Sequence, residues 1–155
     1  MRTPLLMLPA VLLCAACAAT PEGTPESDAD AKRFESEPRA AVVYLYRNDG
    51  SQAITTMQVN QRLLGQSLPA SYFRLRTNAG LNRFTIIGPD TGTFDLIAQF
   101  GEVYFVAMDV TGAGDHSSPT STRFRLVEPE IGKAAITRCC SLVQSWRPGQ
   151  PRFMW

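Results

Sequence analysis

The only histidine in the chain, His116, lies in the run Asp115-His116-Ser117-Ser118, which contains the three side-chain types of a hydrolytic triad. A triad requires a histidine that is oriented by one group and aimed at a nucleophile. Neighbours within one loop rarely reach that geometry, and the sequence contains no G-x-S-x-G motif. We therefore expect a solvated turn and a protein that is not an enzyme, while catalysis by His116 stays open as an alternative. A single histidine and the absence of a recognisable carboxylate pair also predict no metal and no cofactor.

Two adjacent thiols, Cys139 and Cys140, could form a disulfide, take part in redox chemistry or bind a metal. Consecutive side chains of an α-helix diverge by about 100° around its axis, which keeps the two sulfurs apart. The surrounding residues predict a helix, so we expect two buried, reduced thiols that are not bonded to each other and pack as small apolar side chains. The alternative is a vicinal disulfide in a broken helix, which would suggest a redox switch.

Two pairs of arginines, Arg74 with Arg76 and Arg123 with Arg125, alternate with apolar residues. In each segment the arginines would occupy one face of a strand and the apolar side chains the other. If the two strands are neighbours, the four cations would form a face that binds an anion or a partner. Otherwise they are solvated on the wet side of a sheet.

Short apolar segments bounded by Gly, Pro, Asn and Asp predict the strands that position these side chains. The stretch from Met57 to Thr77 organises the body of the chain: a hairpin that turns at Asn60-Gln61 is followed by an alternating strand. Residues 41–47 (A-V-V-Y-L-Y-R) are apolar on both faces and predict a strand interior to a sheet. The expected strands are 41–47, 54–60, 62–65, 71–77, 82–87, 93–99, 102–110 and 122–127.

Residues 129–143 predict one amphipathic helix that begins at Pro129, although Gly132 weakens it. The apolar face would contain Ile131, Ala134, Ala135, Cys139 and Leu142, and Ile136, Cys140 and Val143 would widen it. The fold class is therefore mainly β, an antiparallel β-sandwich of about seven to eight short strands with one C-terminal amphipathic helix. The expected core residues are Phe73, Leu75, Phe84, Phe124 and Leu126.

The first residues have the character of a targeting segment. Residues 1–17 combine Arg2, a short apolar run and the sequence C-A-A-C, which resembles a bacterial lipobox with Cys17 as the lipidated residue. Ordinary secretory cleavage is the alternative. Residues 18–39 hold three prolines, six acids and few large apolar side chains, and they predict a disordered, acidic and Pro-rich tether. Residues 40–155 form the expected β-sandwich domain with its helix and tail.

Several of these segments resemble a bacterial lipoprotein family that carries the domain of unknown function numbered 2846. The similar stretches are A-V-V-Y-L-Y-R at 41–47, V-N-Q-R-L-L-G-Q-S-L at 59–68, S-Y-F-R-L-R-T at 71–77 and G-E-V-Y-F-V at 101–106. The resemblance implies a small β-sandwich behind a lipidation signal, without an assigned reaction.

Composition narrows the function. A net charge of +1 argues against a dedicated nucleic-acid binder, and 45% apolar residues suffice for a core. We expect a non-enzymatic lipoprotein of the bacterial outer membrane, anchored through the lipid on Cys17, whose periplasmic domain binds a protein or another envelope component. The alternative is a sandwich that binds a small ligand or glycan through the loops 88–92 and 111–121, or an enzyme that uses His116.

Overall fold

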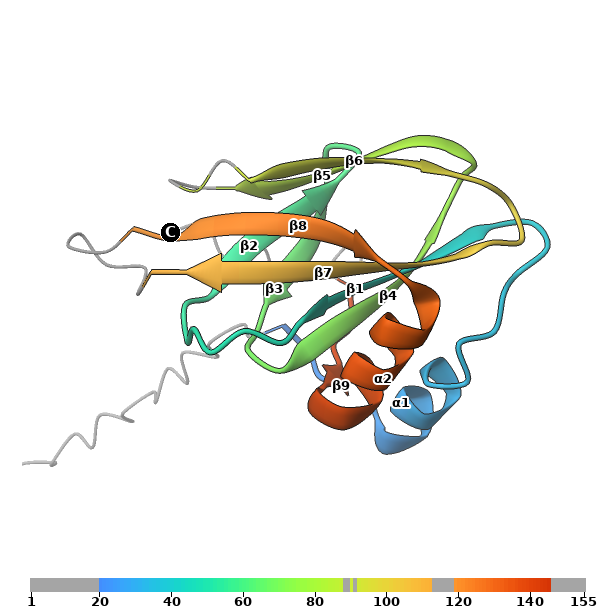
Figure 1. Cartoon of the computed structure of the whole chain (residues 1–155), viewed down its shortest axis with the longest axis horizontal. Helices are drawn as coiled ribbons and strands as arrows, with labels where there is room; N and C mark the ends of the chain where they lie inside the picture. Colours follow the sequence, from blue (N-terminus) through green and yellow to red (C-terminus); the bar gives the residue numbers. More distant parts are fainter. Residues whose placement is uncertain (1–19, 88–89, 91, 113–118, 146–155) are drawn as a thin grey trace, which may run out of the picture.

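The computed structural model describes residues 20–87, 90, 92–112 and 119–145, and it shows a sandwich of two β-sheets with two helices on one side (Figure 1). The predicted β-sandwich with a C-terminal helix is confirmed. The helices are α1 (Pro25–Ala31) and α2 (Pro129–Cys139). The strands are β1 (Ala41–Arg47), β2 (Thr55–Val59), β3 (Arg62–Ser67), β4 (Ser71–Thr77), β5 (Gly80–Ile87), β6 (Thr93–Ala98), β7 (Val103–Thr111), β8 (Ser121–Val127) and β9 (Ser141–Leu142).

One sheet has the order β8-β7-β1-β4-β9, and the other has the order β3-β2-β5-β6. β1 is the central strand of the first sheet and is buried over its whole length, which confirms the prediction from its continuous apolar run. It pairs antiparallel with β4 but parallel with β7, and β4 pairs parallel with β9. The two parallel pairs were not expected from the sequence, because they join segments far apart in the chain.

The predicted hairpin between β2 and β3 is present. Its two loop residues, Asn60 and Gln61, have φ values of 50° and 64°. Positive φ at both central residues is the signature of a type I′ turn, whose twist matches that of the flanking strands. The turn therefore sets the pairing of β2 and β3 next to it, from Val59 opposite Arg62 to a register shift at Met57 and Gln58.

The main core lies between the two sheets. Phe73 and Phe84 are buried there, and Leu75 and Phe124 are partly buried against the same cluster. The prediction for Leu126 was wrong, because its side chain is 53% exposed. Leu126 lies opposite Val106 on the edge strand β8, where alternation places a side chain on the inner face without ensuring that the facing sheet covers it.

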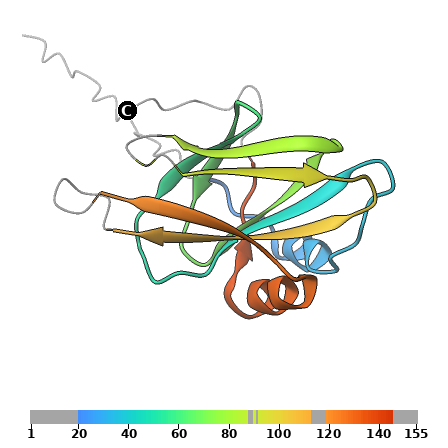
Figure 2. The ribbon, with the colours of Figure 1, turned by 45° about the horizontal axis from the view of Figure 1, so that its top comes forward.

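A second apolar layer lies on the outer face of the five-stranded sheet, beneath the two helices (Figure 2). Tyr44 and Phe105 stack there with ring centroids 5.2 Å apart, and Phe34 meets Tyr44 edge-on at 5.1 Å. Ala31 of α1 and Ile136 of α2 are buried on this layer. Both faces of the five-stranded sheet are therefore covered at its central strand, which explains why β1 is buried along its whole length.

The prediction of a disordered tether over residues 18–39 was wrong for its described part, 20–39. Thr24 caps α1 by accepting a hydrogen bond from the Ser27 N–H, and Pro25 occupies the first turn of the helix. Ala31 and Phe34 bury themselves against the sheet. The low apolar content of the segment was a poor guide, because the Ala31 methyl group, the Phe34 ring and several hydrogen bonds connect the segment to the sheet.

The helix α2 begins at Pro129 as predicted but ends at Cys139, four residues earlier than expected. Its buried residues are Gly132, Ala135 and Ile136. Ala135 and Ile136 belong to the predicted apolar face, whereas Ile131 and Ala134 are exposed, so that face was correct only in part. The face that α2 turns toward the sheet is set by Gly132, which lies directly over Phe105 and lets the helix backbone approach the sheet. Neither helix in the described part of the chain is long and apolar enough to cross a membrane.

Candidate functional site

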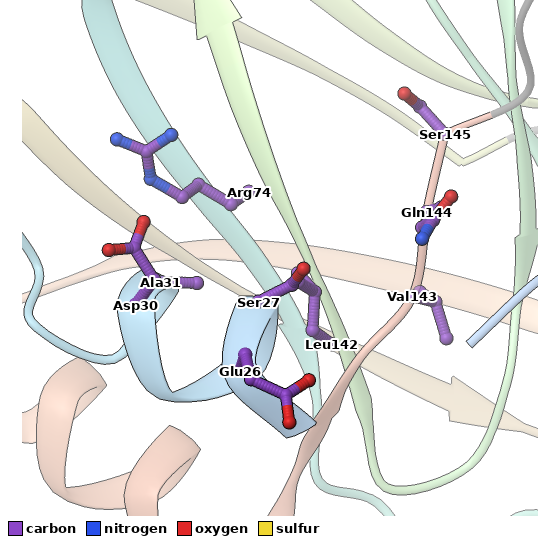
Figure 3. Close-up of a pocket in the computed structure, with 9 residues that line it drawn as sticks. All are labelled: Glu26, Ser27, Asp30, Ala31, Arg74, Leu142, Val143, Gln144 and Ser145. Carbon is purple, nitrogen blue, oxygen red and sulfur yellow. The ribbon is translucent and has the colours of Figure 1, made fainter. Parts of the chain in front are cut away.

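A groove of about 590 Å³ lies between α1 and the segment that follows α2. One wall is α1, the other is formed by residues 142–145, and Arg74 of β4 lies over the end of α1 that carries Asp30 and Ala31 (Figure 3). The lining residues are Glu26, Ser27, Asp30, Ala31, Arg74, Leu142, Val143, Gln144 and Ser145. We call this feature the α1 groove.

The α1 groove exists because β9 leaves its neighbour after a few residues. Ser71 and Tyr72 of β4 pair with β9, and the Val143 N–H donates to the Tyr72 carbonyl at 2.9 Å. The chain then turns away, and the Gln144 N–H donates to the carbonyl of Pro21 at 2.8 Å. In the described part of the chain, no strand lies beside the rest of β4 on this side, from Arg74 to Thr77.

The wall formed by α1 is fixed by Asp28. Its carboxylate accepts hydrogen bonds from Lys32 Nζ at 2.7 Å, from the Leu142 N–H at 2.8 Å and from the Tyr72 hydroxyl at 3.0 Å. Burial acts to raise the pKa of Asp28, but these bonds outweigh it and hold the pKa below its ordinary value. Burial and the bond to Asp28 both raise the pKa of Tyr72, so this hydroxyl stays a donor. One carboxylate therefore joins α1, β4 and β9.

Arg74 is part of a second polar network at the groove. Its Nε donates to the Tyr44 hydroxyl at 3.2 Å, and its guanidinium contacts Glu37 at 2.8 Å. The Tyr44 hydroxyl in turn donates to the carbonyl of Ala31 at 2.5 Å, and burial raises the pKa of Tyr44. Glu37 also pairs with Arg76 at 2.5 Å. Glu37 is therefore shared by two arginines, and the three groups together carry one net positive charge.

Acidic groups dominate the open side of the groove. Glu26 and Asp30 lie on the α1 wall and are exposed. A hydrogen bond from its own backbone N–H, together with the Thr24 hydroxyl, holds the pKa of Glu26 below its ordinary value. Asp30 also pairs with Arg33 at 2.6 Å, so the negative charge that the α1 wall presents to an incoming ligand comes chiefly from Glu26.

The four arginines predicted to form one face do not come together. All four lie on the outer face of the five-stranded sheet, but β4 and β8 are separated by β1 and β7. Arg125 pairs with Asp109 at 3.1 Å, while Arg74 and Arg76 share Glu37. The condition for a shared anion-binding face, neighbouring strands, is not met.

The prediction that Cys139 and Cys140 are unbonded was wrong, because the structure contains a disulfide between them. Cys139 is the last residue of α2, and Cys140 has the extended dihedral angles φ −126° and ψ 144°. The geometric objection to a bond within a helix is removed because the helix ends between the two residues.

Sequence reasoning missed the ion pair of Arg47 with Asp49. Arg47 is fully buried, and its Nε and Nη2 contact the two carboxylate oxygens of Asp49 at 2.8 and 3.1 Å. Its remaining donors bind the carbonyls of Ser51 and Ala53. Burial acts to raise the pKa of Asp49, but the bonds from Arg47 and from the backbone of Val110 and Ser51 outweigh it and lower the pKa. The sequence signal for this ion pair was an arginine that ends an apolar strand two residues before an aspartate. Because every donor of the Arg47 guanidinium is satisfied, the pair closes a loop and does not form a ligand site.

Other predicted features lie outside the described residues. These are Cys17 with its lipobox, His116 and most of the two loops proposed for a small ligand. No protein-family model, no curated protein and no solved structure matches this chain. The resemblance to the lipoprotein family with the domain of unknown function 2846 therefore stays a prediction.

Proposed function

We propose that this protein is a non-enzymatic lipoprotein of the bacterial outer membrane, anchored through Cys17, whose α1 groove binds an extended segment of a partner protein in the envelope. The single observation that carries the binding proposal is the edge of β4 at the groove, beside which no strand of residues 20–145 lies, as far as these are described, beyond the pairing with β9. A strand that lies beside an open sheet edge gains backbone hydrogen bonds, and the adjoining pocket then selects side chains.

The backbone groups that would bind the segment follow from the pairing with β9. The Tyr72 carbonyl accepts from Val143, and alternate residues of a strand direct their backbone groups to the same side. Arg74 and Arg76 therefore direct their N–H and C=O groups toward the groove side of β4. The space between β4 and residues 143–145 widens along this edge, as the diverging ribbons show (Figure 3).

Charge indicates the kind of segment. Glu26 and Asp30 border the groove. Asp30 is paired with Arg33 and Arg74 shares Glu37 with Arg76, so Glu26 carries the negative charge that is available on the α1 wall. A basic side chain of the partner would therefore find opposite charge on the α1 wall. We propose an extended segment that carries a lysine or arginine.

Site-specific photo-crosslinking in intact cells tests the binding proposal. A photoreactive residue at Ser27 would project from the α1 wall, and one at the exposed Thr137 of α2 is the control. We expect a discrete crosslinked protein at Ser27 and none at Thr137. Charge reversal provides matched variants, because Glu26 and Glu130 are both exposed acids in the first turn of a helix. Glu26→Lys should abolish the crosslink and Glu130→Lys should preserve it.

Equal products at Ser27 and Thr137, or a product that survives Glu26→Lys, would contradict binding in the α1 groove. The anchor is tested separately by labelling cells with a radioactive fatty acid. We expect the label on the unmodified chain and not on Cys17→Ser; equal labelling of the two would refute the lipid assignment.

A further inference from the structure

The Cys139–Cys140 disulfide lies at the junction between α2 and β9, next to the wall of the α1 groove. Cys140 is buried, and its sulfur lies 3.5 Å from the carbonyl oxygen of Arg47. Cys139 is only partly buried at the edge of the helix-covered layer. The two sulfurs of this bond therefore differ in their access to solvent.

We infer that Cys139 and Cys140 form a thiol–disulfide exchange site that reacts with a dithiol and controls the local stability of β9. Exchange needs a thiolate that approaches one sulfur along the axis of the bond. Because Cys140 is covered, the reductant attacks Cys139 Sγ. The bond between the two protein sulfurs breaks, and its electron pair leaves on Cys140 Sγ, which takes a proton from solvent.

The second thiolate of the same reductant then completes the reaction. It attacks the reductant sulfur of the mixed disulfide, releases Cys139 as a thiolate that takes a proton, and leaves the reductant as a disulfide. The dithiol thus loses two electrons and the protein gains them. As a thiol, Cys140 can donate a weak hydrogen bond to the Arg47 carbonyl, which gives the reduced form a defined place for this buried group.

The disulfide affects β9 because adjacent cysteines cannot be bonded while both are helical. Cys140 already donates its N–H to the carbonyl of Ile136 at 3.1 Å, which is the hydrogen bond of a continuing α-helix. The apolar residues Leu142 and Val143 follow Cys139 at the helical spacings of three and four. Reduction therefore removes a constraint against growth of α2 into these residues.

Growth of the helix would compete with the bonds that hold the groove wall. As a strand, Leu142 donates its N–H to Asp28, and Val143 donates to Tyr72. Since Asp28 also anchors α1, opening of β9 loosens both walls of the groove. This consequence for binding rests on the proposed function, whereas the exchange reaction and the change in β9 do not.

Hydrogen exchange and thiol trapping on the purified protein test the inference without any partner. Alkylation under denaturing conditions without reductant should place no alkyl group on Cys139 or Cys140. Dithiothreitol added to the folded protein should give two alkyl groups after trapping. Reduction should then accelerate amide exchange at Leu142 and Val143 by about tenfold, while exchange in the central strand β1 stays unchanged.

Variants separate the contributions of the two thiols. Replacement of both cysteines by serine should give fast exchange at β9 whether or not dithiothreitol is present. With an aromatic disulfide as the probe, Cys139 in the Cys140→Ser variant should react about tenfold faster than Cys140 in the Cys139→Ser variant. Equal rates for the two thiols would refute attack at Cys139.

Three further outcomes would overturn the inference. These are free thiols in protein purified without reductant, reduction only under denaturing conditions, and unchanged exchange at β9 after reduction. A failure of the proposed binding function would instead appear in the crosslinking experiment and leave these measurements as expected.

Discussion

The substitution Gly132→Ala tests how closely α2 lies on the sheet. Helix propensity alone predicts that this change stabilises the protein by about 1 kcal/mol, because glycine is a poor residue for a helix interior. The structure predicts the opposite. A Cβ atom added at Gly132 would lie 2.4 Å from Cβ and Cγ of Phe105, which is 1% exposed.

The size of the effect follows from these opposing contributions. Phe105 Cβ is fixed to the β7 backbone and cannot rotate away, so either the helix or the strand must shift. Overpacking of a core costs about 1–3 kcal/mol and occasionally more, and contacts this short to three atoms of one side chain place the cost at the upper end. After the gain in propensity, we expect a net loss of about 2 kcal/mol, or a decrease in Tm of roughly 4–8 °C.

Urea denaturation followed by far-UV circular dichroism measures this loss, with an unchanged m value as the sign that the unfolded state is unaffected. Gly50→Ala is the matched control, because its added Cβ would meet no atom within 4 Å. This control should be neutral or stabilising by up to about 1 kcal/mol. If Gly132→Ala is as stable as the unmodified protein, then α2 does not approach Phe105 as described.

Substitutions at Asp28, Arg47, Asp49, Phe73 and Arg76 probe the polar anchors and the core. Asp28→Ala should destabilise the protein by about 2–3 kcal/mol and increase hydrogen exchange in α1. Because the pKa of Asp28 is lowered in the folded state, its contribution to the free energy of unfolding is complete above the ordinary pKa of 3.8 and is lost as the pH falls below it. The stabilities of wild type and variant should therefore converge in acid. Arg47→Met should cost about 3–5 kcal/mol in urea denaturation because it leaves the carboxylate of Asp49 unpaired. Arg47→Met combined with Asp49→Leu should cost less than the sum of the two single changes. Additive losses would argue against the ion pair. Phe73→Ala should lower the free energy of unfolding by about 3–5 kcal/mol. Arg76→Ala should lower it by under about 0.5 kcal/mol, because the Arg76 side chain is 66% exposed. Similar losses for the two variants would mean that the register of β4 is inverted.

Local sequence patterns were sufficient for most of the strands. The continuous apolar run at 41–47 predicted a central strand, and alternation predicted β4 with Phe73 inward. Asn60-Gln61 predicted the hairpin, and Pro129 marked the start of α2. These features depend on the two-residue period of a strand and on dihedral preferences, both of which are properties of neighbouring residues.

The candidate site could not be predicted in the same way. The α1 groove depends on a bond from Leu142 to Asp28, two residues more than a hundred positions apart. Such contacts have no periodicity, and Asp28 in a Pro-rich, acidic segment has the composition of a disordered linker. The groove therefore became visible only when the tertiary structure placed α1 beside β9.

The sequence by itself determined the strands β1 to β8, where the hairpin turns and that a helix follows β8, but it placed β9 inside the predicted helix. Only the tertiary structure decided the order of the strands, which separates Arg74 from Arg125, and the end of α2 at Cys139. The physical reason is a competition between local and distant contacts. Helical spacing in residues 129–143 favours a longer helix. Pairing of residues 141–143 with Ala70 and Tyr72 provides competing backbone hydrogen bonds, and the disulfide holds Cys140 extended.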